Sequence, residues 1–149
     1  MNLDEFIAEA KTNTYASQRE GGESVLEDGS KELIYSKDSF KYRDRYSGYN
    51  SFSGQEVVWQ DGQTVWSMNY YGRVISPSLS AKKVYIFLKQ ALRLVKKDKP
   101  FRGPTEFTLD NFKYFNKSQG NLKNFTGEEK IFYNGEEVYN LNYDGGKIK

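Results

Sequence analysis

Apolar residues near the start of the chain recur with the period of a helix. Leu3, Phe6, Ile7 and Ala10 follow the i, i+3, i+4, i+7 spacing that places side chains on one helix face. Asn2 stands where an N-cap is expected, and Glu5 follows three residues later, as in a capping box. The pattern predicts a helix over about 2–13.

A second stripe of the same kind lies in the middle of the chain. It is formed by Val84, Phe87, Leu88, Ala91, Leu92 and Val95. Ser80 is a suitable N-cap, and Pro100 cannot continue a helix because it lacks the backbone N–H. We predict a helix over about 80–98, with its basic residues mainly off the apolar stripe.

The remaining segments alternate between apolar and polar residues, which is typical of strands. Asp61-Gly62 and Asn134-Gly135 separate neighbouring strands and suit the tight turns of hairpins, because both residue types tolerate a positive φ. The glycine-containing stretch 17–30 is predicted to be a loop. The predicted strands cover 33–36, 40–46, 55–60, 64–70, 106–109, 112–115, 129–133 and 137–143.

The strand segments form an internal repeat. Residues 39–72 align with 111–145 when one extra residue, Lys123, is allowed, and 12 of the 34 aligned pairs are identical. Each repeat is preceded by one of the two predicted helices, in the order helix and then four strands. We therefore predict an α+β fold in which two tandem helix-plus-antiparallel-sheet repeats, related by a pseudo-two-fold axis, form a single domain over 1–149.

One face of the predicted sheet combines aromatic rings with carboxylates. Glu56 and its repeat counterpart Glu129 lie on this face by strand alternation. They are candidates for catalytic acids or ligand anchors, but their presence in both halves favours a structural role as acceptors for Tyr hydroxyls or the neighbouring hairpin. Asp44 differs, because Asn116 replaces it in the second half. Asp44 and Glu56 could form a glycosidase-like pair if their carboxyls lie about 5–9 Å apart.

The linker after the second helix contains Phe101-Arg102-Gly103-Pro104. The planar fork of Arg102 can clamp an anionic ligand or a carboxylate of the protein. We favour a structural tie between Arg102 and one of the buried acids.

Composition narrows the possible chemistry. The chain has no Cys and no His, which excludes disulfides, thiolate or imidazole metal sites and any catalytic triad that uses an imidazole base. Its 24 aromatic residues equal its Leu, Ile and Val combined, so rings must build much of the core. No phosphate-cradling glycine motif precedes a helix, and we assign neither a metal nor a cofactor.

Charge is uneven along a chain whose net charge is only +2. The segment Lys82–Lys99 holds seven Lys and Arg against one Asp. This block could contact nucleic acid, but a solvated helix face is the favoured interpretation, and nucleic acid is not an expected partner. The N-terminus lacks the basic and apolar segments of a signal peptide, and no apolar run is long enough for a membrane span. A cytoplasmic location is expected.

Several motifs resemble a bacterial family of domains of unknown function. They are Tyr42 to Gly48, Phe52 to Trp59, Val65 to Gly72, Phe101 to Pro104 and Val138 to Gly146. In that family the domain stands alone or follows a helix-turn-helix segment, which implies a sensor or partner-binding role in some members. Many members carry a His before the last Gly-Gly, where this chain has Tyr143-Asp144, so no His-dependent chemistry carries over.

These observations predict a non-enzymatic module that binds a small molecule or a peptide on the aromatic face. The predicted ligand contacts are Tyr42, Glu56, Trp66, Tyr70 and Arg102. The alternative is a hydrolase or lyase that uses Asp44, Glu56 or Glu129.

Overall fold

The structure, a computed structural model, describes residues 1–14 and 22–149. Positions 17–21 of the predicted loop lie outside the described residues. The described elements are α1 (Leu3–Thr12), β1 (Ser24–Val25), β2 (Lys31–Lys37), β3 (Phe40–Gly48), β4 (Phe52–Gln60), β5 (Gln63–Val74), α2 (Ala81–Leu92), β6 (Glu106–Leu109), β7 (Phe112–Asn121), β8 (Asn124–Tyr133) and β9 (Glu136–Lys147).

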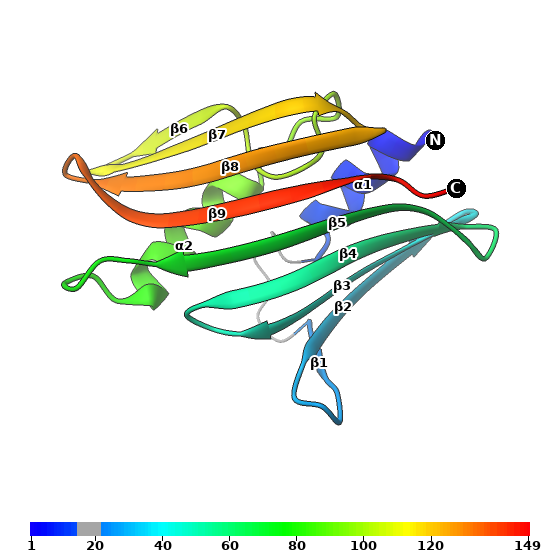
Figure 1. The fold of residues 1–149 in the computed structure, drawn as a ribbon, viewed down its shortest axis with the longest axis horizontal. Coiled ribbons are helices and arrows are strands. Elements are labelled where there is room, and N and C mark those ends of the chain that lie inside the picture. Colours follow the sequence, from blue (N-terminus) through cyan, green and yellow to red (C-terminus); the bar gives the residue numbers. More distant parts are fainter. Residues whose placement is uncertain (15–21) are drawn as a thin grey trace.

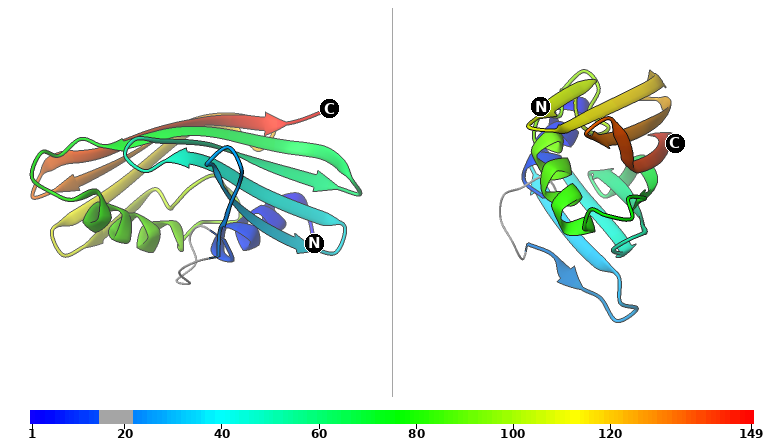
Figure 2. Two further views of the ribbon diagram at one scale, coloured as in Figure 1. Left: turned by 90° about the horizontal axis from the view of Figure 1, so that it is seen from below. Right: turned by 90° about the vertical axis from the view of Figure 1, so that its left-hand side faces the viewer.

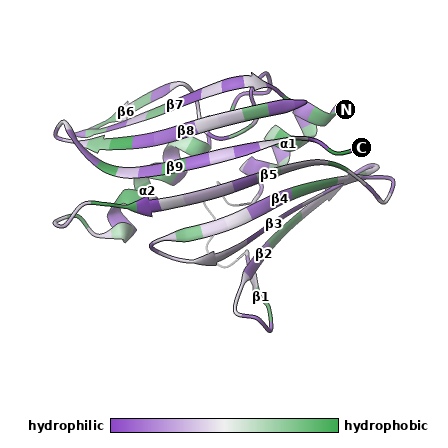
Figure 3. Cartoon of the chain, viewed as in Figure 1, coloured by the Kyte–Doolittle hydropathy of each residue, from purple (hydrophilic) through white to green (hydrophobic). Residues whose placement is uncertain are grey.

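The nine described strands form one antiparallel sheet in the order β1-β2-β3-β4-β5-β9-β8-β7-β6 (Figure 1). The sheet is curved, and both helices lie on its concave face (Figure 2). Hydrophobic and hydrophilic residues alternate along several strands, as Figure 3 shows, so one face of the sheet is apolar and meets the helices.

The predicted α+β fold of two helix-plus-sheet repeats is wrong. The strands of both halves belong to one sheet, because β5 and β9 pair from Trp66↔Lys147 to Val74↔Tyr139, and the fold is β-rich with two short helices. Two separate four-stranded sheets would leave the backbone groups of both strands unpaired at an edge. Pairing β5 with β9 satisfies these groups and leaves only the short strands β1 and β6 at the edges.

The hairpin predictions are confirmed. Asp61 and Gly62 have φ values of 50° and 81°, and Asn134 and Gly135 have values of 51° and 80°. The pairing registers of the two halves also correspond, since Tyr42 faces Val58 and Tyr114 faces Ile131, with a register shift directly after Val58 and after Ile131.

Each helix is held on the sheet by aromatic stacking. Phe6 of α1 stacks on Phe40 at a centroid distance of 4.8 Å, and Phe87 of α2 stacks on Phe112 at 4.7 Å. The capping box at Asn2 and the Ser80 cap are both present. In the described part of the chain, neither helix has the length and apolar character needed to cross a membrane.

The second helix is shorter than predicted. It ends at Leu92 with Arg93 as its C-cap, so the last six residues of the predicted 80–98 helix are not helical. The chain turns there, and the following segment buries Phe101 and Arg102 against the sheet. In the basic segment Lys82–Lys99 every Lys is exposed.

Candidate functional site

The concave face holds two buried glutamates, one in each half of the sheet. Glu56 of β4 accepts a hydrogen bond from the Tyr42 hydroxyl at 2.6 Å and pairs with Lys11 Nζ of α1 at 3.2 Å. Lys11 also donates to the Phe101 carbonyl and lies over the Trp66 ring. Burial lowers the pKa of Lys11 to about 8, and the negative charge of Glu56 opposes this shift. This cluster joins α1 to the sheet.

The second glutamate, Glu129 of β8, is also fully buried. Arg102 donates to both of its oxygens, from Nε at 3.1 Å and from Nη2 at 2.8 Å. The hydroxyls of Tyr114 and Tyr139 donate to the same carboxylate at 2.5 and 2.7 Å. Burial, followed by the charge of Glu129, raises the pKa of both tyrosines well above the usual value. The predicted structural tie of Arg102 to a buried acid is confirmed.

The two halves differ at Asp44 and its counterpart Asn116. Tyr70 donates to Asp44 Oδ1 and Tyr143 donates to Asn116 Oδ1, both at 2.6 Å. Asn116 uses its amide as well, because Nδ2 donates to the Gly103 carbonyl at 2.9 Å. A carboxylate has no such donor. Asp44 therefore keeps the tyrosine contact of its counterpart but cannot make the amide contact.

Asp44 is a buried acid with a raised pKa. Its side chain is 3% exposed and lies directly across the β3–β4 pair from Glu56. Burial, and next the charge of Glu56, raise the pKa of Asp44 to about 7, against the opposing effects of Tyr70, Arg102 and Lys11. Glu56 Oε2 has no hydrogen-bond donor among the described residues.

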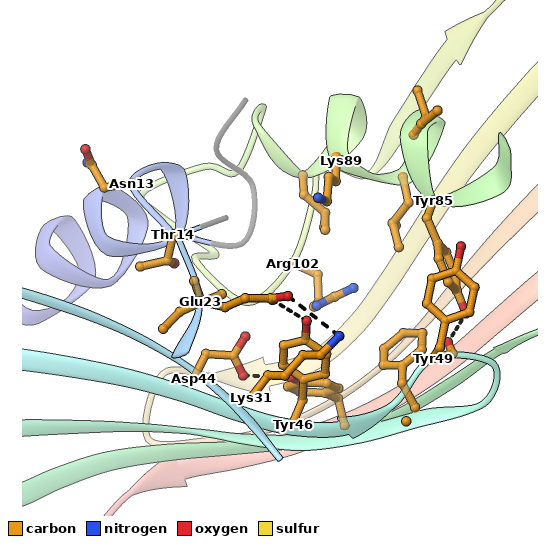
Figure 4. A pocket seen from close by; sticks show the side chains of 18 of the residues that line it. Asn13, Thr14, Glu23, Lys31, Asp44, Tyr46, Tyr49, Tyr85, Lys89 and Arg102 are labelled. Carbon is orange, nitrogen blue, oxygen red and sulfur yellow. Dashed lines mark hydrogen bonds and ion pairs between the residues drawn. The ribbon is translucent and has the colours of Figure 1, made fainter. Parts of the chain in front are cut away.

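A cavity of about 630 Å³ lies between the sheet and α2, near the end of α1 (Figure 4). Asp44 projects into it from the sheet, and Arg102 enters it from the opposite, helix side. Five rings line it: Tyr46, Tyr49, Phe52, Tyr70 and Tyr85. Charged side chains that border it nearer the exterior are Glu23, Lys31, Lys82 and Lys89.

The aromatic lining is itself well packed. Tyr85 meets Tyr49 edge-on at 5.2 Å and Phe52 at 5.7 Å, and its hydroxyl donates to the Tyr49 carbonyl at 2.6 Å. The Arg102 guanidinium lies 5.7 Å from the Tyr70 ring centroid. The lining is thus preorganised by contacts that need no ligand.

Three of the residues singled out from the sequence border this cavity, namely Asp44, Tyr70 and Arg102. The other four lie outside the lining and are fully buried: Tyr42, Glu56, Trp66 and Glu129. The cavity therefore brings together one carboxyl, one guanidinium and one of the predicted aromatic contacts.

Sequence reasoning missed Lys11. A signal was present, because Lys11 follows Leu3 and Ile7 at the i, i+4, i+8 spacing that puts all three on the face of the helix that meets the sheet. The rings of Tyr49 and Tyr85 carried no such signal, because they meet only when α2 folds over the β3–β4 turn.

Residues 1–14 and 22–149 contain no group of three or more His, Cys, Asp or Glu side chains that could hold a metal ion.

Comparison with known proteins places the chain in one family. The family model of a domain of unknown function, DUF5680, matches residues 44–148. No curated protein and no solved structure matches the chain.

Proposed function

Since the chain belongs to the DUF5680 family, whose function is unknown, we propose a function from the cavity itself: the protein binds a small molecule there without transforming it. The observation that carries the proposal is Asp44, a buried carboxyl at the surface of a ring-lined cavity. Ligand sites of proteins combine apolar or aromatic linings with a few polar groups that orient the ligand.

The size and composition of the cavity support a small ligand. Its volume of about 630 Å³ falls inside the range of 300–1,000 Å³ that is usual for ligand pockets. Tyr46, Tyr49, Phe52, Tyr70 and Tyr85 supply apolar contact area, while Asp44 supplies a strong acceptor.

A carboxylate-dependent hydrolase or lyase is less well supported. A glycosidase-like enzyme of this kind needs two carboxyls that reach the same substrate. Of the three candidates, Asp44 borders the cavity, whereas Glu56 and Glu129 are fully buried and engaged by Lys11 and Arg102.

The proposal is tested by a thermal-shift screen of metabolites followed by calorimetry on each hit. Tyr85→Ala removes one side of the cavity, and we expect the affinity of a true ligand to fall at least tenfold. Phe115→Ala is the matched control, because it removes a partly exposed ring that does not border the cavity. A screen without hits, or hits that bind Tyr85→Ala as tightly as the wild type, would contradict the proposal.

A further inference from the structure

The buried charges of the described residues on the concave face do not balance. Among residues 1–14 and 22–149, the buried Lys, Arg, Asp and Glu side chains are two cations, Lys11 and Arg102, and three acids, Asp44, Glu56 and Glu129. Lys11 pairs with Glu56 at 3.2 Å, and Arg102 pairs with Glu129 at 2.8 Å. The ionised form of Asp44 therefore adds one negative charge for which the described part of the chain supplies no further buried cation.

The second half of the sheet has no such excess. Asn116, the counterpart of Asp44, is neutral and spends its amide on the Gly103 carbonyl at 2.9 Å. An asparagine at position 44 would preserve the Tyr70 contact, since Asn116 accepts from Tyr143 in the same way. The fold therefore does not require an acid at this position, and what distinguishes position 44 is that it borders the cavity.

From this juxtaposition of an unbalanced carboxylate and a ring-lined cavity, and resting on the proposed function, we infer that the ligand is a small organic cation whose protonated amine lies beside Asp44. A protonated amine supplies the missing positive charge and donates hydrogen bonds to the carboxylate. The faces of aromatic rings also attract cations, and Tyr46, Tyr49 and Tyr85 line the same cavity.

The lysines around the cavity do not reverse this preference. Lys31 pairs with Glu23 at 3.7 Å, and Lys82 and Lys89 are exposed on α2. Exposed charges are screened by water and salt, whereas a charge interaction beside the buried Asp44 acts at a lower effective dielectric constant. Asp44 therefore dominates recognition at the inner end of the cavity.

Binding of the cation competes with a proton. The groups that face Asp44 are Glu56 from β4, Tyr70 from β5, Lys11 from α1 and Arg102 from the segment after α2, with Tyr46 on its own strand. With a pKa of about 7, the carboxyl is about 10% ionised at pH 6 and about 90% ionised at pH 8. Amine affinity should therefore rise about tenfold from pH 6 to pH 8.

The test uses the full chain and probes that share a carbon skeleton but differ in charge. One series is tyramine, tyrosol and 4-hydroxyphenylacetate, and the other is cadaverine, 1,5-pentanediol and glutarate. Calorimetry at pH 6 and pH 8 is done on the wild type, on Asp44→Asn and on the exposed control Asp38→Asn. Each variant is first checked for a cooperative melting transition.

We expect an amine to bind the wild type and Asp38→Asn more tightly than its alcohol or carboxylate partner. The amine affinity should rise about tenfold with pH and fall at least tenfold in Asp44→Asn. The pH dependence on the wild type alone keeps the inference testable if Asp44→Asn does not fold.

Three results would overturn the inference: no amine binds, an amine binds Asp44→Asn unchanged, or its wild-type affinity does not change with pH. If 4-hydroxyphenylacetate or glutarate binds the wild type and this binding is lost in Lys89→Gln, the ligand of the cavity is an anion. That outcome would leave the proposed function in place, because the metabolite screen with Tyr85→Ala tests binding in the cavity whatever the charge of the ligand.

Discussion

Tyr70 of β5 and Tyr143 of β9 face each other directly at the centre of the sheet. They are also counterparts in the sequence repeat, so the pairing of the two halves is centred on this pair. Each hydroxyl donates a hydrogen bond to a side chain two strands away in the sheet. Tyr70 donates to Asp44 of β3, and Tyr143 donates to the counterpart Asn116 of β7. The two tyrosine contacts are therefore equivalent in geometry, but only the one in the first half involves an acid, Asp44, and this acid borders the cavity.

Asp44→Asn should raise stability at neutral and higher pH. Because the pKa of Asp44 is raised from 3.8 to about 7, the folded chain holds a proton that the unfolded chain releases, and wild-type stability falls as pH rises between these values. We expect Asp44→Asn to be more stable than the wild type at pH 8 by more than about 1 kcal/mol.

The stability difference between Asp44→Asn and the wild type should shrink toward pH 4, because Asp44 is then protonated in the folded chain and is as neutral as the asparagine. Urea unfolding between pH 4 and pH 8 measures it. Asp38→Asn, on an exposed turn, should show no such trend. A stability difference that is constant with pH would mean that Asp44 does not titrate in this range.

Lys11→Met should be strongly destabilising, because it leaves the buried Glu56 without its cation. The expected cost is about 3–5 kcal/mol in the free energy of unfolding. The matched control is Lys37→Met, which removes an exposed, solvent-screened ion pair with Glu9 and should be far less destabilising than Lys11→Met.

A double-mutant cycle separates charge from packing in the same cluster. Combining Lys11→Met with Glu56→Gln should cost less than the sum of the single changes, because no unpaired charge remains. Additive costs would indicate that Lys11 contributes by packing alone.

Arg102→Lys should destabilise although the charge is kept. A lysine cannot direct two parallel N–H groups at Glu129, so at least one charged hydrogen bond is lost, at about 1.5–3 kcal/mol. Arg45→Lys is the control, because Arg45 donates from the same two nitrogens to Oε2 of Glu32, in a partly exposed setting. Equal effects in chemical denaturation would show that burial is irrelevant to this contact.

Gly54→Ala should disturb the Tyr70–Asp44 contact. A Cβ at position 54 would lie 2.3 Å from the Tyr70 hydroxyl and 2.7 Å from the Arg45 carbonyl, so the ring must move. We expect a loss of about 1–3 kcal/mol and weaker binding of any cavity ligand.

The matched change is Gly127→Ala, whose Cβ would meet the Tyr143 ring at 1.9 Å, away from the cavity. It should lower the melting temperature without changing ligand affinity once the protein is folded. Equal effects of the two alanines on affinity would place the ligand elsewhere.

Much of the fold and part of the site follow from local sequence. Alternation placed Glu56 and Glu129 on the buried face, and the Asp-Gly and Asn-Gly pairs marked both hairpins, because side-chain direction and turn geometry depend on neighbouring residues. The difference between Asp44 and Asn116 was visible from the repeat alone.

Only the tertiary structure decided how these parts combine. The pairing of β5 with β9 joins residues 65 to 81 positions apart, and backbone hydrogen bonds between strands carry no residue-specific signal that would reveal it. Lys11 meets Glu56, and Tyr85 meets Tyr49, because each helix docks on the curved sheet as a whole. Strand alternation in the sequence placed Asp44 on the aromatic face. The docked position of α2, which the sequence did not reveal, determined that this carboxyl borders a cavity instead of lying in the closed core.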